Sequence, residues 1–351
     1  MKPSNETVRR FLRWLWANLL TATGFLWWAK RQLRMSGAVI ALTLHRVLVE
    51  DDFLKTNSLP GIVVRESTFR ELVAHLADSY EPVSLSSASP GRASGRIRIV
   101  FTFDDGWVDN YKVAFPIARQ HCVPVTIFIC PGLMDQESPF WPERVVGLMK
   151  ATRPSVTSME IEAEIERLKF CTDEERAQQI ERLLQEVRTR AIPIEASGVD
   201  STFSWAAAGE MADAGIDFGS HTQTHQILTK ILADRALREI RESKNGLESK
   251  FNKSCETFAY PNGTWSAETR CLLAEEGFSL AFTTERGAWT DSSDPLAIPR
   301  CNVAEDDLVG PKGRFSPLMF EYTVLWKAWR ASKVKSNRTA QAAHDPAATA
   351  A

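Results

Sequence analysis

The stretch from Ile97 to Trp107, Ile-Arg-Ile-Val-Phe-Thr-Phe-Asp-Asp-Gly-Trp, constrains the fold of this chain more than any other. It begins as a run of β-branched and aromatic residues, which is typical of a buried strand. It ends in two adjacent carboxylates, Asp104 and Asp105, followed by Gly106. A buried carboxylate is unfavourable without a charged or hydrogen-bonding partner, so the pair indicates a site in which one carboxylate binds a metal and the other acts as a base. The alternative is a tight turn, which Asp-Asp-Gly also suits.

A second short apolar segment leads into Ser220-His221-Thr222-Gln223-Thr224-His225. Residues four apart share one face of a helical turn, so a turn of helix here would bring the two imidazoles together. Two imidazoles and one carboxylate form a common ligand set for a catalytic divalent ion, with Zn as the default and Co or Ni as alternatives. The chain has only six His, so this pair, taken with Asp104 and Asp105, favours a metal site over a turn and two unrelated histidines.

The residues Thr102-Phe103-Asp104-Asp105-Gly106 and the segment from Ser220 to His225 resemble the first two motifs of the polysaccharide deacetylase family, the NodB-homology group or carbohydrate esterase family 4. The resemblance covers residues 39–303 and implies an α/β fold, a distorted (β/α) barrel of the NodB type. It also implies metal-dependent removal of acetyl groups from sugars. In this hypothesis Asp105, His221 and His225 hold the metal and Asp104 is the base.

Two further segments bear on the catalytic residues. A strand predicted over residues 39–44 ends at His45-Arg46-Val47, which resembles the opening of a subgroup that acts in exopolysaccharide synthesis. In that subgroup this His is implied to be the catalytic acid, which assigns the role to His45. The segment from Thr257 to Gly263 resembles the third family motif, but Ala259 stands where many members have an Arg that orients the base. Arg300 is the candidate replacement, and pairing with a surface acid is its alternative.

The expected reaction is hydrolysis of the N-acetyl group of an amino sugar in a polysaccharide, an oligosaccharide or a lipid-linked sugar. A backbone N–H near Tyr260 is a candidate donor to the oxyanion, and Trp107 is a second candidate contact with the substrate. Two other functions stay open. One is a carbohydrate-binding or scaffold protein on the same barrel that has lost turnover, which the Ala259 replacement suggests. The other is a hydrolase of a non-sugar amide.

The domain organisation follows from the order of the patterns. Alternating strands and helices indicate an α/β architecture, and the resemblance implies that the barrel covers residues 38–311. A helical insertion is expected over about 140–200, because residues 159–190 are charged, helix-forming and apolar at helical spacing. The six Cys form no Cys-x-x-Cys pair and several lie in apolar segments, so free thiols are expected.

The two ends of the chain, residues 1–37 and 312–351, are expected to lie outside the barrel. Residues 1–36 and residues 312–338 each carry seven Lys or Arg and one Glu, and the ends hold six of the eleven Trp. The uncharged run at 14–29 is shorter than the ~20 residues of a spanning helix, and its Trp content is typical of a membrane interface. A helix over residues 7–34 is therefore expected to lie on an anionic membrane surface. A signal peptide and a helix packed on the barrel are the alternatives.

The expected location is the cytoplasmic side of the inner membrane, because scattered free Cys suit a reducing compartment. Export with an uncleaved N-terminal anchor is the alternative. The tail from Ser336 is expected to be disordered. The whole chain has a formal net charge of −2, so the body between the two basic ends is acidic, which argues against nucleic-acid binding by the body.

Overall fold

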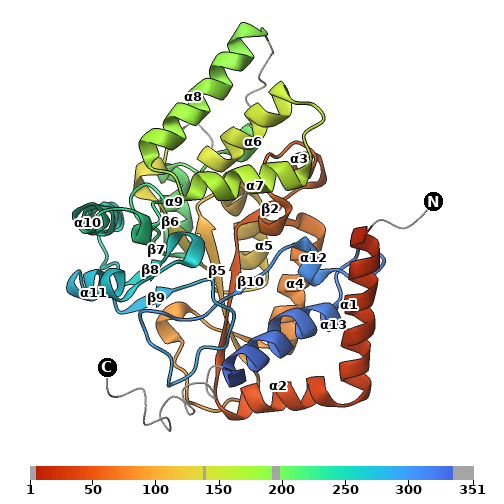
Figure 1. Ribbon diagram of the computed structural model, residues 1–351. Helices are drawn as coiled ribbons and strands as arrows, with labels where there is room; N and C mark the ends of the chain where they lie inside the picture. The colour runs from red at the N-terminus through yellow and green to blue at the C-terminus, as the bar shows by residue number, and fades with distance from the viewer. Residues whose placement is uncertain (1–4, 137–139, 192–197, 335–351) are drawn as a thin grey trace, which may run out of the picture.

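The computed structural model describes residues 5–136, 140–191 and 198–334 (Figure 1). Its centre is an eight-stranded parallel sheet in which seven strands follow the order β10-β1-β5-β6-β7-β8-β9 and β4 pairs with β5 at the side. A separate parallel pair consists of β2 and β3. The strands of the main sheet are β1 (Val39–Leu44), β4 (Glu81–Pro82), β5 (Arg98–Asp105), β6 (Thr126–Ile129), β7 (Asp217–Ser220), β8 (Thr257–Ala259), β9 (Leu280–Phe282) and β10 (Cys301–Asn302), and those of the small sheet are β2 (Arg46–Leu48) and β3 (Val63–Arg65).

The sheet curls into a distorted (β/α) barrel, as the sequence predicts. Ile298 forms a parallel bridge with Phe282 of β9, and three residues further on β10 pairs with β1. The short segment between them therefore closes the curl, and Arg300 lies within it. Along β5 the side chains alternate between the barrel interior and the surrounding helices, so Thr102 and Asp104 share the inward face with Val100. This alternation is what directs a carboxylate into the barrel.

Helices cover the outside of the sheet (Figure 1). Apolar side chains from the helices pack against the outward-facing residues of the strands in one large cluster that includes Phe69, Phe101 and Phe103. The helices of the barrel are α4 (Glu66–Ser79), α5 (Phe115–Gln120), α9 (Trp205–Asp213), α10 (Ala233–Phe251) and α11 (Ala267–Glu275), with the shorter α3 (Glu50–Phe53), α12 (Glu305–Leu308) and α13 (Pro317–Phe320). Two π-helical turns, η3 (Asn110–Ala114) and η8 (Glu321–Trp326), and six 3₁₀ turns complete the set: η1 (Pro60–Ile62), η2 (Leu85–Ser87), η4 (Pro131–Leu133), η5 (Gly198–Asp200), η6 (Leu228–Lys230) and η7 (Pro261–Gly263).

Three helices between β6 and β7 occupy the segment for which the sequence predicts a helical insertion. They are α6 (Trp141–Thr152), α7 (Ser158–Lys169) and α8 (Asp173–Thr189), and they form a second apolar cluster apart from the barrel core. Thr157 and Thr172 each accept a hydrogen bond from the third residue of the following helix in a capping box, which explains why the expected helical stretch forms two helices. Figure 1 shows the three helices together at one end of the barrel.

The N-terminal segment differs from the single helix expected over residues 7–34. It forms α1 (Asn5–Ala22) and α2 (Phe25–Met35), which lie at a steep angle to each other (Figure 1). Gly24 separates them with φ of 77°, a left-handed conformation that glycine adopts at no steric cost. Among the described residues, none of the helices combines the length and the hydropathy that crossing a bilayer requires.

The C-terminal segment also differs from the expectation of a free amphipathic segment beginning at residue 312. Phe320, Val324, Leu325 and Ala328 are fully buried in the main core cluster. Their apolar side chains are therefore covered by the barrel and by α2, which η8 contacts. The tail from residue 335, including the part expected to be disordered, lies outside the described residues.

Candidate active site

The buried carboxylate of Asp104 pairs with the guanidinium of Arg300. Arg300 Nη1 donates to Asp104 Oδ1 at 2.8 Å and Nη2 donates to Oδ2 at 2.6 Å. Arg300 Nε donates to the carbonyl of Thr283 and Nη1 also donates to Thr102 Oγ1, so the guanidinium is fixed on both sides. Burial alone would raise the pKa of Asp104, but the charge and hydrogen bonds of Arg300 outweigh it and hold this pKa below its ordinary value. Asp104 is therefore ionised and fixed in orientation.

Three potential metal ligands meet beside this pair, as the sequence predicts. His221 Nε2 lies 3.4 Å and His225 Nε2 lies 3.3 Å from Asp105 Oδ1, and the three ligand atoms all lie within 4.8 Å of one another. Ligands at 2.0–2.2 Å from one tetrahedral ion are about 3.4 Å apart, so these separations suit a single Zn-like ion. Asp105 Oδ1 is buried and has no hydrogen-bond partner among the residues that the structure describes. An orphaned carboxylate oxygen between two imidazole nitrogens fits a metal site.

The contacts behind the ligands set their orientation. The Nδ1 of His221 lies 2.7 Å from the backbone carbonyl of Ala259. Since a carbonyl only accepts, Nδ1 carries the proton and Nε2 is left with a lone pair for a metal. Trp107 Nε1 donates to Asp105 Oδ2 at 3.1 Å. Phe140 contacts the ring of His225, with 5.6 Å between the ring centroids.

The backbone at both motifs departs from regular structure, which corrects one expectation. His221 and His225 do not share a helical turn: residues 221–227 contain no helix, and Thr222 and His225 have φ of 67° and 61°. The loop, rather than a helix, brings the imidazoles together. Asp105 has φ of 76°, a left-handed conformation that Asp tolerates better than most residues and that recurs at functional sites. Gly106 follows with φ of 78°, and a Cβ there would come within 2.9 Å of Ile129.

His45 lies at the carboxyl end of β1, where the sequence expects a catalytic acid. Burial lowers the pKa of His45, although the charges of Asp105 and Asp104 oppose this. Its Nδ1 is buried and makes no hydrogen bond to the described residues. Asn110 donates to the His45 carbonyl at 2.8 Å, which holds the backbone in place. The charges that act on the imidazole place it near both carboxylates, and its buried Nδ1 carries unused hydrogen-bonding capacity.

Tyr260 and Trp107, which the sequence suggests as contacts for the substrate, are instead hydrogen-bonded within the protein. The N–H of Tyr260 already donates to the carbonyl of Phe282 in β9, and its hydroxyl donates to the carbonyl of Leu296. Neither group is available to an oxyanion, because both are used by the barrel itself. The indole of Trp107 is 1% exposed and its N–H is bound to Asp105. Trp107 therefore holds the carboxylate of the candidate ligand Asp105 in place.

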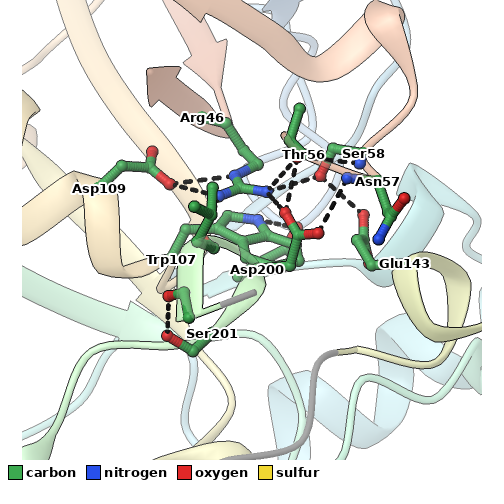
Figure 2. A network of polar contacts seen from close by, with 12 residues as sticks. Arg46, Thr56, Asn57, Ser58, Trp107, Asp109, Glu143, Asp200 and Ser201 are labelled. Carbon is green, nitrogen blue, oxygen red and sulfur yellow. Dashed lines mark hydrogen bonds and ion pairs between the residues drawn. The ribbon is translucent and has the colours of Figure 1, made fainter. Parts of the chain in front are cut away.

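A buried ionic network around Arg46, which the sequence did not reveal, lies directly behind Trp107 (Figure 2). The guanidinium carbon of Arg46 lies 4.4 Å from the centroid of the Trp107 ring. Arg46 also forms ion pairs with Asp109, at 2.9 Å, and with Asp200, at 2.5 Å. Asp109 follows the Asp-Asp motif by four residues and Asp200 ends the helical insertion, so one cation joins three distant segments. The only signal in the sequence is the position of Arg46 next to His45.

The geometry defines a class of protein: a (β/α) barrel with a candidate metal centre at the carboxyl ends of its strands, where the active sites of such barrels lie. The family model for polysaccharide deacetylases matches residues 91–281, more than half of the chain. The chain therefore belongs to the polysaccharide deacetylase family, whose members hydrolyse acetyl groups in amide or ester linkage.

Individual relatives are distant. YxkH of Bacillus subtilis (strain 168), which its name assigns to the polysaccharide deacetylases, is 22% identical over 206 residues, 59% of this chain. The chain spans about half, 51%, of the length of that relative. The deacetylase PplD of Streptococcus pyogenes, solved in complex with acetate, has a TM-score of 0.53 at 18% identity over 80% of this chain and 99% of its own. IcaB of Ammonifex degensii has a TM-score of 0.53 at 17% identity over 84% and 97%. These structures share the fold.

Proposed function

We propose that this chain is a metal-dependent deacetylase that hydrolyses the N-acetyl group of an amino sugar. One observation carries the proposal: Asp105, His221 and His225 place three ligand atoms within 4.8 Å of one another, beside a carboxylate that Arg300 holds at both oxygens. If Arg300 and Asp104 formed a purely structural ion pair, three potential metal ligands would not be needed beside them. If those three residues bound no metal, a buried oxygen of Asp105 without a partner among the described residues would be unfavourable.

Each residue of the site has a separate role in the proposed hydrolysis. A divalent ion, Zn by ligand type with Co or Ni as alternatives, would supply Lewis-acid activation of a water and of the acetyl carbonyl. Asp104 accepts the proton of the attacking water at a carboxylate oxygen, and Arg300 keeps that oxygen in position. His45 donates a proton from its ring to the departing amine. A lowered pKa makes His45 a readier donor once it is protonated.

The proposed substrate is an acetylated amino sugar in a polymer, an oligosaccharide or a lipid-linked sugar of exopolysaccharide or cell-envelope synthesis. Two points support this class: the membership of the polysaccharide deacetylase family, and the resemblance of His45-Arg46-Val47 to the exopolysaccharide subgroup. The fixed pair of Arg300 and Asp104 counts against a scaffold that has lost turnover, because the function of the Arg missing at position 259 is then supplied from another segment.

The test is acetyl release from chito-oligosaccharides and from lipid-linked amino sugars, with Zn or Co added. The D104N variant should keep stoichiometric metal and lose turnover, since it removes a base and no ligand. The D105N variant should lose metal affinity. Binding of the sugars without acetyl release would instead identify a carbohydrate-binding protein. Acetyl release from non-sugar amides alone would identify a hydrolase of a non-sugar amide.

The role of His45 is tested separately. H45A should lower kcat by about 10²–10⁴, the usual contribution of general acid catalysis, with metal content unchanged. The matched control is H121A, which alters a histidine at the end of α5. If H45A turns over at the wild-type rate, another group protonates the leaving amine.

A further inference from the structure

Helix α1 turns most of its large apolar side chains to solvent, and two of its three Arg side chains, Arg10 and Arg13, to the protein. Ala17 and Leu20 are buried, and the helix packs on α2 and α13. Arg10 and Arg13 form ion pairs with Asp306 and Asp307 of α12. The opposite side of the helix is an apolar stripe whose six members are 41–57% exposed: Val8, Phe11, Leu12, Leu15, Trp16 and Leu19.

This orientation is the reverse of that of an ordinary surface helix, which buries its apolar face and exposes its charges. The two ion pairs fix the helix in this orientation, because rotating the stripe inward would break both of them. A continuous apolar stripe of this size on a soluble surface marks a site of interaction. Further exposed apolar side chains continue on α2, where Trp27 is 66% and Trp28 is 40% exposed.

A basic cavity of about 260 Å³ opens beside α2, between this helix, the end of α4 and the start of β5. Four cations line it: Lys30, Arg31, Arg34 and Arg96. The one acid in its lining, Glu321, is already paired with Lys30 and accepts a hydrogen bond from Tyr80. In the part of the chain that the structure describes, neither Arg31 nor Arg34 has an ion-pair partner, and both are exposed. The exposed ring of Trp27 also lines this cavity.

We propose that α1 and α2 form a docking surface for an anionic lipid bilayer, in which the stripe of α1 enters the interfacial layer and the cavity beside α2 binds a lipid phosphate group. Uncompensated guanidinium groups bind phosphate oxygens in a fixed geometry. Tryptophan concentrates at the same depth as the lipid head groups. The cavity thus combines an aromatic side chain that suits the apolar part of a bilayer surface with cations that suit its phosphate groups.

A second copy of this chain fits the surface less well. An isologous dimer through α1 and α2 would bring two sets of Arg31, Arg34 and Arg96 towards one interface. These charges have too few acids near them to compensate, so like charges would repel. An anionic bilayer supplies the missing negative charge. The proposal is independent of the deacetylase activity, which soluble substrates test separately.

The experiment is co-sedimentation of the full chain with vesicles of phosphatidylcholine alone and of phosphatidylcholine containing one third phosphatidylglycerol. The wild-type chain should bind the anionic vesicles at low salt, and added salt should weaken but not abolish binding, because the apolar contacts are not screened. The L12S/L15S and R31E/R34E double variants should each lower the partition coefficient at least about tenfold.

Matched controls separate these contacts from general surface effects. L54S/L232S removes two leucines that are 76% and 82% exposed elsewhere, and K55E/K112E makes the same change of charge at exposed positions. Both control variants should bind like the wild type. Vesicle binding that is unaffected by R31E/R34E would overturn the phosphate site. A dimer that L12S/L15S dissociates, without vesicle binding by the wild type, would overturn the bilayer in favour of a second copy.

Discussion

The carboxylate of Asp104 is held at both oxygens by one side chain, and the chemistry of that side chain matters as much as its charge. A guanidinium presents two parallel N–H groups to a carboxylate, whereas an ammonium presents a single point of charge. Arg300 is fully buried and arrives from the segment between β9 and β10, 196 residues away in the sequence. The segment that closes the barrel next to β10 therefore also orients the carboxylate of Asp104.

We therefore expect R300K to lower kcat by about 10², because a displaced base loses its alignment with the attacking water while a positive charge remains nearby. Metal content, measured by mass spectrometry, should not change. R286K is the matched control, since Arg286 donates to backbone carbonyls and touches no residue of the site. A wild-type kcat in R300K would show that charge alone suffices. Loss of metal in this variant would place Arg300 in support of the ligands instead.

At the residue scale, the sequence predicts the candidate ligands better than the residues that hydrogen-bond to them or pack behind them. Asp105, His221 and His225 belong to short motifs and could be chosen from local spacing. The partners of Arg46 lie 63 and 154 residues away, and no local pattern links residues at such separations. The same limit explains Tyr260: its N–H is used by a neighbouring strand, which only the assembled sheet reveals.

At the scale of elements, the strands follow from the sequence most closely. The observed β1 has the bounds that the pattern predicts, because it is an apolar run with clear breaks at both ends. The sequence pattern does not predict the break at Gly24 or the non-helical loop that carries His221 and His225. Both depend on left-handed backbone conformations, which do not alter the periodicity of apolar residues.

Helix α6 carries an unusual acid towards the Arg46 network. Glu143 is 4% exposed, and its Oε1 accepts a hydrogen bond from Ser58 at 3.0 Å (Figure 2). Its Oε2 is buried and has no partner within the described ranges. Burial raises the pKa of Glu143 to about 7, although the charge of Arg46 opposes this. The unfolded chain should titrate near the ordinary value of 4.5. Between these two values the folded state holds a proton that the unfolded state has lost, so stability falls as the pH rises through this window.

In the E143Q variant the side chain at this position cannot ionise, so the free energy of unfolding should not show this fall with rising pH. Between about pH 5.5 and about pH 8 the free energy of unfolding of the wild type should fall by about 2 kcal/mol relative to E143Q, measured by denaturant titration. E162Q, which alters an exposed acid of α7, should follow the wild type. Equal pH profiles for the wild type and E143Q would mean that Glu143 titrates as an ordinary exposed acid.

At the scale of the whole molecule, the two ends of the chain meet on the barrel. Residues of η8 contact α2, and Trp28 of α2 contacts Trp329 with 4.8 Å between ring centroids. The sequence predicts that both ends are amphipathic, but it does not predict whether each apolar face is exposed or packs into the core. In α1 the face stays exposed, whereas at η8 it enters the core. Composition is similar at the two ends, so only the packing of the barrel distinguishes them.

This difference makes the C-terminal segment part of the folded unit. Val324 is fully buried in the core cluster that contains Leu33 of α2 and Leu76 of α4. Burying a carboxylate there without a partner costs several kcal/mol, which is comparable to the whole stability of a typical domain. We expect V324D to abolish cooperative unfolding or to lower Tm steeply, as followed by circular dichroism.

The matched control is V334D, because Val334 is 46% exposed at the end of the same segment. It should melt like the wild type. A chain that ends at residue 311 removes Phe320, Val324 and Leu325 together and should fail in the same way as V324D. If that shorter chain instead unfolded cooperatively at the wild-type Tm, the segment would be an appendage, and the apolar surface of the barrel that it covers would have to be stable in water.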